Sequence, residues 1–156
     1  EDRYREADAC LSAALRDCHP DHAANRRRIV MNLVPARLQR GRLPSLALLE
    51  RYRLQPYVPI VTAMRTGNVA QFQACMREHR AFFIASGVYL LLERLELIVY
   101  RSLFRRVFVA TGNTQLKLEA LSGPLRTLGV TVDLDELECL LANLIHRRLI
   151  KGYISH

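Results

Sequence analysis

The stretch NTQLKLEALSGPLRTLGVTVDLDELECLLANLIHRRLIKGYISH, residues 113–156, decides the fold that we expect for this chain. Apolar stripes with a period of about 3.6 residues predict one helix over residues 119–128, ended by Gly129, and a second over residues 134–148. Asp133 precedes the second helix, and a glutamate at its third helical position completes a capping box.

Two further segments of this stretch predict β-strands. Residues 115–118 alternate polar and apolar side chains, and residues 149–155 form an apolar-rich run after the second helix. The order strand, helix, helix, strand is that of a winged helix, with a third strand expected just past His156. The helix at 134–148 would then occupy the position of the recognition helix.

Upstream of this stretch, helix signals recur throughout the chain. We expect helices over residues 1–17, from an N-cap at Asp21 to Gly41, and over residues 45–51, 57–66, 68–79, 80–86 and 88–110. Pro35 lies inside the second of these helices and should kink or break it. The spacing of the helix pairs is that of solenoid repeats. The expected fold is all-α with a small β part: stacked antiparallel helical repeats over residues 1–112, and a winged helix over residues 113–156 that lacks its last strand.

The positive charge of the chain is concentrated in its middle. The net charge is +8 overall; by segment it is −3 over residues 1–21, +11 over residues 22–112 and zero over residues 113–156. This distribution fits an acidic partner, either nucleic acid or an acidic protein segment. The basic residues are 21 arginines and two lysines, and the planar guanidinium of arginine suits phosphates and carboxylates.

Apolar runs and cysteines limit the class of protein. No apolar stretch reaches the roughly 18 residues that a membrane span needs, so we expect no membrane insertion. The four cysteines form no CxxC pair, and Cys75 and Cys139 fall among apolar residues, which predicts reduced, buried thiols in an intracellular protein. Residues 18–22, CHPDH, lack the second spaced pair that zinc sites use. We expect a polar turn there, with neither a metal nor another cofactor.

Two sets of motifs carry a resemblance to a known family. The first set is Gly67-Asn68, His79, Phe82-Phe83, Gly87-Val88-Tyr89 and Leu91-Leu92-Glu93. The second, more specific set is Leu33-Val34-Pro35-Ala36-Arg37 with Gly41 and Pro44, Ala142-Asn143-Leu144-Ile145, and KGYISH at 151–156. Over about residues 25–156 the chain resembles the PCI domain of proteasome-lid, signalosome and initiation-factor subunits. It is most similar to the PCI subunit of the nuclear complex that couples transcription to mRNA export at the nuclear pore; signalosome-associated relatives share the fold and stay an alternative.

The resemblance implies partners and a location. Such a subunit pairs through its PCI domain with the PCI region of a large scaffold subunit of the germinal-centre-associated or Sac type. A small, acidic, largely disordered subunit shared with the proteasome lid braces it. The two juxtaposed winged helices bind RNA or DNA without strong sequence preference. The expected location is the nucleus, including the periphery of the nuclear pore, with a cytoplasmic pool.

Seven basic side chains are the candidates for nucleic-acid contact: Arg94, Arg101, Arg105, Arg106, Arg147, Arg148 and Lys151. The first three share one face of the predicted helix at 88–110 and have no acidic residue three or four positions away. Such a row contacts phosphates, or else it is a solvated face or pairs with another helix. The last three lie at the end of the helix at 134–148 and the start of the strand after it, where cations also stabilise the helix dipole without any ligand.

Six arginines and a tyrosine are the candidates for partner binding: Arg26, Arg27, Arg28, Arg37, Arg40, Arg42 and Tyr153. The arginines form the densest positive patch of the sequence, which could receive the acidic small subunit as easily as nucleic acid. Tyr153 lies on the predicted terminal strand, where an open sheet edge could pair with a partner's strand.

No motif of a catalytic site occurs in the sequence. It has no P-loop, no GxSxG, no HExxH and no Gly-rich turn from strand to helix, so we do not expect an enzyme. Three functions stay open: a nuclear scaffold subunit with a composite nucleic-acid surface, a purely architectural subunit of a lid-like or signalosome-like assembly, and a winged-helix transcription regulator. Acidic residues at the start of the helix at 134–148 weigh against the third, because that end of a recognition helix reads bases in DNA.

Overall fold

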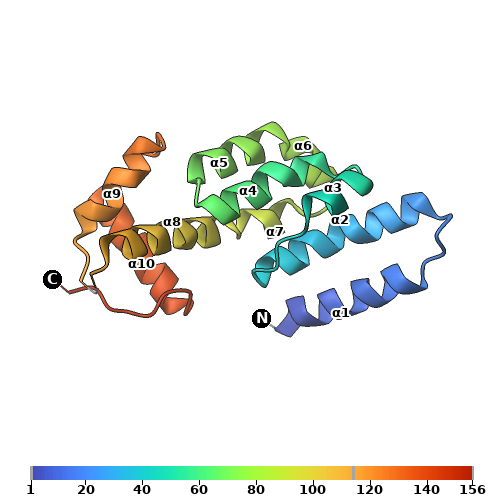
Figure 1. The fold of residues 1–156 in the computed structure, drawn as a ribbon, viewed down its shortest axis with the longest axis horizontal. Helices are drawn as coiled ribbons and strands as arrows, with labels where there is room; N and C mark the ends of the chain where they lie inside the picture. The colour runs from blue at the N-terminus through green and yellow to red at the C-terminus, as the bar shows by residue number, and fades with distance from the viewer. Residues whose placement is uncertain (1, 114, 156) are drawn as a thin grey trace. The chain divides into compact units, whose positions relative to one another are not determined.

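The computed structural model describes residues 2–113 and 115–155, which form helices, turns and loops (Figure 1). The elements are α1 Asp2–Asp17, α2 Ala23–Gln39, α3 Leu46–Arg51, the 3-10 helix η1 Gln55–Tyr57, α4 Val58–Thr66, α5 Val69–Glu78, α6 Arg80–Ala85, α7 Tyr89–Glu93, α8 Glu96–Thr111, α9 Leu118–Thr127 and α10 Leu134–His146. No helix among the described residues is long and apolar enough to cross a membrane. The predicted helical class is confirmed.

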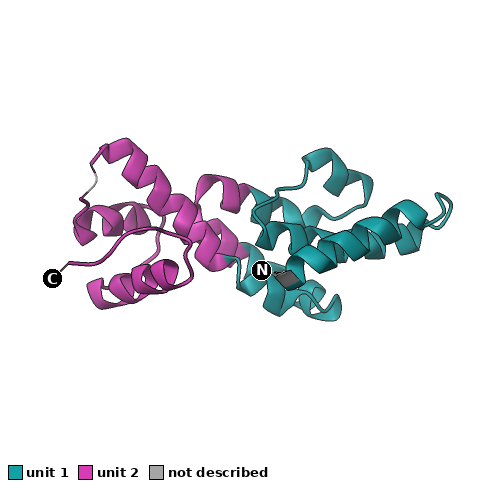
Figure 2. Cartoon of the chain, turned by 90° about the horizontal axis from the view of Figure 1, so that it is seen from below, with its two compact units in different colours: residues 1–61, 75–95 teal, residues 62–74, 96–156 magenta. Residues whose placement is uncertain are grey.

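The chain divides into two compact units (Figure 2). Unit 1 consists of residues 1–61 and 75–95, and unit 2 of residues 62–74 and 96–156. These units do not coincide with the expected division at residue 112, because the tip of the α4–α5 hairpin groups with α8, α9 and α10. The assignment of residues 113–156 to a winged helix stays a prediction.

In unit 1, α1 and α2 lie side by side and run in opposite directions (Figures 1 and 2). Val30, Leu33 and Leu38 of α2 are almost completely buried, as the apolar stripe predicted. The predicted N-cap at Asp21 was wrong. The N-cap is His22, whose side chain makes no capping hydrogen bond, and the Asp21 carboxylate lies 3.4 Å from His19 Nδ1 instead.

Pro35 lies inside α2 and does not break it. Proline has no N–H, so the carbonyl oxygen of Met31, four residues earlier, lacks its helical donor. The hydroxyl of Tyr57 donates to that oxygen at 2.9 Å, and the Tyr57 side chain is completely buried. Of the two predicted outcomes, a kink or a break, the break does not occur, because η1 supplies the missing donor.

The single long helix predicted over residues 88–110 was wrong, because one turn separates α7 from α8. The Leu95 N–H donates to the carbonyl of Leu92 at 2.8 Å, and not to that of Leu91 as a continuous α-helix requires. The Leu91 carbonyl accepts instead from the side-chain amide of Gln39 at 2.5 Å. A side chain of α2 therefore stabilises the interruption. No Gly or Pro lies at this point of the sequence to indicate it.

In unit 2, the turn between α4 and α5 packs directly on α8. Gly67 has a φ of +75°, and a Cβ there would lie 2.5 Å from the backbone nitrogen of Leu103. Only glycine meets both conditions without strain. As predicted, Asn68 opens α5, where its side-chain oxygen accepts from the Gln71 N–H at 3.0 Å. The core of this unit consists mainly of Val99, Leu103, Phe104, Leu121, Leu125, Leu137 and Leu144.

The strands predicted at 115–118 and 149–155 do not form in the described part of the chain. Leu118 already belongs to α9, which shortens the first segment. Residues 151–155 have no regular structure, because a strand needs a partner for its backbone groups and no described segment pairs with them. The expected third strand past His156 falls outside the described residues.

The predictions for the cysteines and for the CHPDH segment were correct in part. Cys75 is buried, and burial together with the charge of Glu78 raises the pKa of its thiol to about 11. Cys139 is exposed, so its predicted burial was wrong. Residues 18–22 form the turn between α1 and α2, as predicted.

Candidate nucleic-acid and partner interface

Two parts of unit 2 bring basic side chains together: α8 and the segment after α10. The Nε–H of Arg101 donates to the carbonyl oxygen of Leu149 at 2.6 Å, which ties the two parts to each other. Arg105 lies one turn further along α8, and three more exposed basic side chains flank Leu149 in the sequence. We call the five side chains the basic edge: Arg101, Arg105, Arg147, Arg148 and Lys151.

The end of α10 holds Arg148 in an unusual backbone conformation. The Arg148 N–H donates to the Ile145 carbonyl and the Leu149 N–H to the Leu144 carbonyl, each at 2.9 Å. This pair of bonds is a Schellman motif, in which the left-handed position is usually glycine. Here that position is Arg148, with a φ of +58°. The chain thus keeps a cation at a position where glycine would be less strained.

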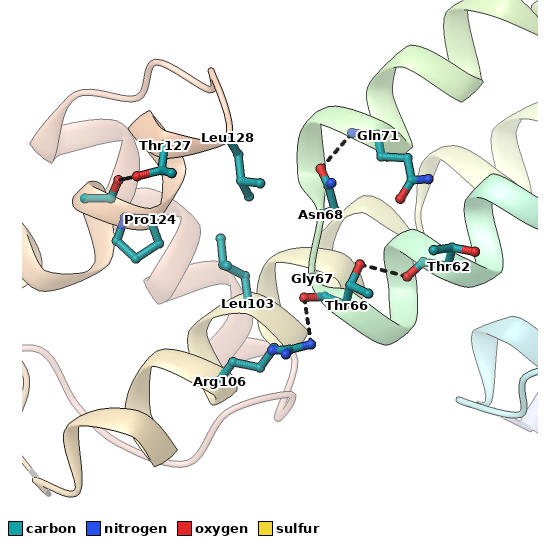
Figure 3. Close-up of a pocket in the computed structure, with 11 residues that line it drawn as sticks. Thr62, Thr66, Gly67, Asn68, Gln71, Leu103, Arg106, Pro124, Thr127 and Leu128 are labelled. Carbon is teal, nitrogen blue, oxygen red and sulfur yellow. Dashed lines mark hydrogen bonds between the residues drawn. The ribbon is translucent and has the colours of Figure 1, made fainter.

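The two remaining nucleic-acid candidates, Arg94 and Arg106, each make a hydrogen bond within their own unit. Arg94 ends α7 in unit 1, where its Nη1–H donates to the Tyr4 hydroxyl at 3.2 Å. It does not share a helix face with Arg101, because α7 and α8 are separate helices. Arg106 donates to the Thr66 carbonyl at 3.3 Å, which joins α8 to the end of α4 (Figure 3).

Three arginines of the predicted partner patch converge on a single carboxylate of α1. Arg37 donates to Asp8 Oδ1 at 2.9 Å, Arg40 donates to Oδ2, and Arg42 lies 3.4 Å from Oδ2. Asp8 is buried, which by itself would raise its pKa. The hydrogen bonds from Arg37 and Ser12 and the charges of Arg37 and Arg40 outweigh burial and hold the pKa of Asp8 below its ordinary value of 3.8.

Two further arginines of this patch also bind within unit 1. Arg26 donates to the Leu15 and Cys18 carbonyls at 3.1 and 2.7 Å, which closes the end of α1. Arg27 donates to the Tyr52 carbonyl at 3.1 Å. Arg28 is exposed and is the member of the run RRR that points to solvent. The densest patch of the sequence therefore serves largely to hold α1 and α3 against α2.

A groove of about 880 Å³ opens in unit 2 between the α4–α5 turn, α8 and α9 (Figure 3). Pro124 and Leu128 of α9 lie on one side of it and Gly67 of the α4–α5 turn on the other, with Leu103 of α8 between them. Threonine hydroxyls and the amides of Asn68 and Gln71 complete its lining. The groove is mainly apolar, and its charged side chain is basic.

The start of α10 is acidic, and its acids have a local role. Asp133 accepts from the Glu136 N–H at 2.7 Å, and Glu136 accepts from the Asp133 N–H at 3.1 Å. This is the predicted capping box, and it is confirmed. The two carboxylates satisfy backbone donors and repel phosphates, so this end of α10 is unsuited to a groove of DNA.

Sequence reasoning missed which arginines are internally bonded. Arg37, Arg40 and Arg42 meet Asp8 only because α1 and α2 are paired, a contact across about 30 positions that spacing along one helix does not show. Tyr153, the predicted edge residue, is 86% exposed but does not lie on a strand.

Comparisons with known proteins agree with the architecture. The PCI domain family model matches residues 76–156. The chain is 42% identical over 151 residues to "PCI domain-containing protein 2 homolog" of Caenorhabditis elegans, covering 96% of this chain and 37% of that protein. It is 40% identical over 161 residues to "Enhanced ethylene response protein 5" of Arabidopsis thaliana, covering 99% and 39%. It is 38% identical over 173 residues to "Protein CSN12 homolog" of Gibberella zeae, covering 99% and 38%. The chain thus spans about two fifths of the length of these relatives.

Proposed function

The chain belongs to the PCI domain family, and from this premise we propose that it is part of a non-catalytic scaffold subunit of a nuclear complex that couples transcription to mRNA export. In this role it pairs with a large PCI-containing scaffold subunit and with a small acidic subunit. Together with the large subunit it forms a composite surface that binds RNA or DNA without sequence preference.

The observation that carries the nucleic-acid part of the proposal is the basic edge. Arg101 binds the Leu149 carbonyl, and the other exposed cations of the basic edge lie near these two residues along α8 and along the end of α10 and the segment after it. Arg105, Arg147 and Lys151 form no ion pair with any residue in the described ranges 2–113 and 115–155, so their charges are available to phosphates. Contacts to phosphate alone carry no sequence information, which is why we propose non-specific binding.

Exposed apolar side chains of unit 2 support the scaffold part. Phe108 and Val109 at the end of α8 are 45% and 68% exposed, and Tyr153 is 86% exposed. Aromatic residues at a surface are typical of the centre of protein interfaces. For the small acidic subunit, Arg28 and Arg42 of unit 1 offer the outward cations, since Arg42 is 62% exposed even beside Asp8.

Charge reversal at the basic edge tests the proposal. Arg105→Glu, Arg147→Glu and Lys151→Glu together should lower the affinity of the full-length protein, purified with its scaffold partner, for single-stranded RNA by at least about a hundredfold at low salt. The matched control reverses three exposed arginines of unit 1, Arg5, Arg16 and Arg77, and so changes the net charge equally. Equal loss in both variants, or no affinity for RNA in the unmodified complex, would refute a specific role for the basic edge.

A purely architectural role is the second candidate, and the internally bonded arginines of unit 1 favour it. Five of the six predicted partner-binding arginines contact Asp8 or backbone carbonyls of their own unit. Co-purification of the tagged full-length protein from nuclei, followed by mass spectrometry, separates the two candidates. Recovery with mRNA-export proteins supports the first, and recovery with proteasome-lid or signalosome subunits alone supports the second.

A further inference from the structure

A second hollow of unit 2, of about 530 Å³, lies between α5, α8 and the segment that leads into α10. Its lining includes Gln73, Tyr100, residues 129–132, Glu136 and Cys139. Among the described residues that line it, Glu136 is the charged side chain, and neither lysine nor arginine contributes. In a chain with a net charge of +8, this hollow is therefore a site of the opposite sign.

Tyr100 contributes to this hollow a hydroxyl that forms no hydrogen bond with the described residues. Its side chain is 6% exposed, yet its hydroxyl has no hydrogen-bond partner among residues 2–113 and 115–155. Burial and the charges of Glu96 and Glu136 raise the pKa of Tyr100 to about 12, and Glu136 lines the same hollow as Tyr100. No buried side-chain polar atom of the described residues lacks a partner, so this hydroxyl is open to solvent on the side of the hollow and can meet a ligand group there.

The two carboxylates are held in place by hydrogen bonds from neighbouring groups. Glu96 Oε1 accepts from the side-chain amide of Gln73 at 2.8 Å. Glu136 Oε2 accepts from the Asp133 N–H at 3.1 Å as part of the capping box. Each of these bonds uses one oxygen of its carboxylate.

The rim of the hollow offers main-chain groups as well. Val130 is anchored by its N–H, which donates to the Leu125 carbonyl at 2.9 Å. Thr131 and Val132 follow without regular structure, and neither exchanges a backbone hydrogen bond with another described residue. An extended peptide can pair with free main-chain groups of this kind while its side chains enter neighbouring pockets.

We propose that this hollow binds an arginine or lysine side chain of a partner protein, carried on an extended segment that runs beside Thr131 and Val132. The cation lies between the Glu136 carboxylate and the Tyr100 hydroxyl, which then accepts a hydrogen bond. The site is separate from the basic edge in residues and opposite in charge. The proposed peptide site can therefore be refuted without refuting nucleic-acid binding at the basic edge, and nucleic-acid binding can be refuted without refuting the peptide site.

The test uses the full-length protein and a short fluorescein-labelled peptide of alternating valine and arginine. The matched peptide carries citrulline in place of arginine, with the same shape and no charge. Binding is followed by fluorescence anisotropy and by the rate at which N-ethylmaleimide alkylates Cys139, an exposed thiol in the lining, with exposed Cys10 of unit 1 as internal reference. The arginine peptide should bind and slow alkylation of Cys139 but not of Cys10, and the citrulline peptide should do neither.

Two conservative variants locate the site. Glu136→Gln keeps the capping box, because glutamine at that position also completes one, and Tyr100→Phe removes only the hydroxyl. Each variant should lower the affinity for the arginine peptide by at least about fivefold. Glu119→Gln, at an acidic residue of α9 outside the lining, should leave that affinity unchanged. The proposal is overturned if the arginine peptide does not bind, if citrulline binds as well, or if Glu136→Gln binds like the unmodified protein. If circular dichroism shows that a variant does not fold, the test rests on the unmodified protein. The proposal then stands only if the arginine peptide slows alkylation of Cys139 and the citrulline peptide does not.

Discussion

At the scale of single residues, Gly67 and Arg148 share a left-handed backbone conformation for opposite reasons. Gly67, with a φ of +75°, lets the α4–α5 turn approach the backbone of Leu103. Arg148, with a φ of +58°, has a side chain where the end of a helix usually has none. The sequence marks Gly67 as the end of a helix, but its contact with α8 depends on tertiary packing and could not be predicted.

Gly67→Ala should lower the free energy of unfolding by about 3 kcal/mol or more. The left-handed φ alone contributes about 1–2 kcal/mol, and the overlap of the new Cβ with the Leu103 backbone adds the rest. Gly129→Ala is the control in the same unit, because its φ is +76° and a Cβ there meets nothing within 4 Å. Urea unfolding of both variants measures the difference; equal losses would contradict the close approach.

Arg148→Gly should stabilise the protein and weaken RNA binding at the same time. Relief of the left-handed strain should raise the unfolding free energy by up to about 1 kcal/mol. Loss of one phosphate contact should lower RNA affinity and reduce its dependence on salt. Arg53→Gly, at the other non-glycine residue of positive φ in the described chain, should leave RNA binding unchanged. If Arg148→Gly binds RNA as tightly as the unmodified protein, Arg148 does not contact phosphate.

Asp8 should make the pairing of α1 with α2 dependent on pH below about 4. The pKa of Asp8 is lower in the folded protein than its ordinary value of 3.8, so its stabilising effect is complete above that value and is lost as the pH falls through the folded pKa. Asp8→Asn should be destabilised at pH 7, whereas near pH 2 it should match the unmodified protein more closely. Hydrogen exchange of α1 amides measures this. Asp21→Asn, at an exposed carboxylate, is the control, and a pH-independent difference at Asp8 would contradict the account.

At the scale of elements, the sequence predicted most helices and their ends but not their interruptions. Periodicity, the Ser45 and Asp133 caps and the glycines after helices are local signals, and they located α1, α3, α9 and α10. The break between α7 and α8 is stabilised by Gln39, a residue more than 50 positions away, so no local pattern could indicate it. The prediction of two strands was wrong for a similar reason, because a strand depends on pairing with a segment that can lie far away in the sequence.

The continuity of α2 should depend on the bond between Tyr57 and Met31. Tyr57→Phe should lower the unfolding free energy by about 1–3 kcal/mol, because it leaves a buried carbonyl without a donor. In a Pro35→Ala background the loss should be smaller, since alanine restores the helical N–H to Met31. A double-mutant cycle by urea unfolding measures the coupling. Equal effects of Tyr57→Phe in both backgrounds would contradict this role of the hydroxyl.

At the scale of the whole molecule, the two units use their cations differently. In unit 1 the arginines that are densest in sequence bind Asp8 and backbone carbonyls, so their charges serve packing. In unit 2 the cations of the basic edge are exposed, and Arg101 ties α8 to the segment after α10. Charge counts along the sequence do not register which of these charges are internally bonded.

The salt dependence of RNA binding tests the central claim most directly. The affinity of the full-length protein, purified with its scaffold partner, for single-stranded RNA is measured across a salt series for the unmodified protein and for the combined Arg105→Ala, Arg147→Ala and Lys151→Ala variant. We predict that the slope of log affinity against log salt becomes shallower by about 2, since each lost phosphate contact on a single strand removes about 0.7. An unchanged slope, or the same change in an Arg5→Ala, Arg16→Ala and Arg77→Ala control, would contradict the account.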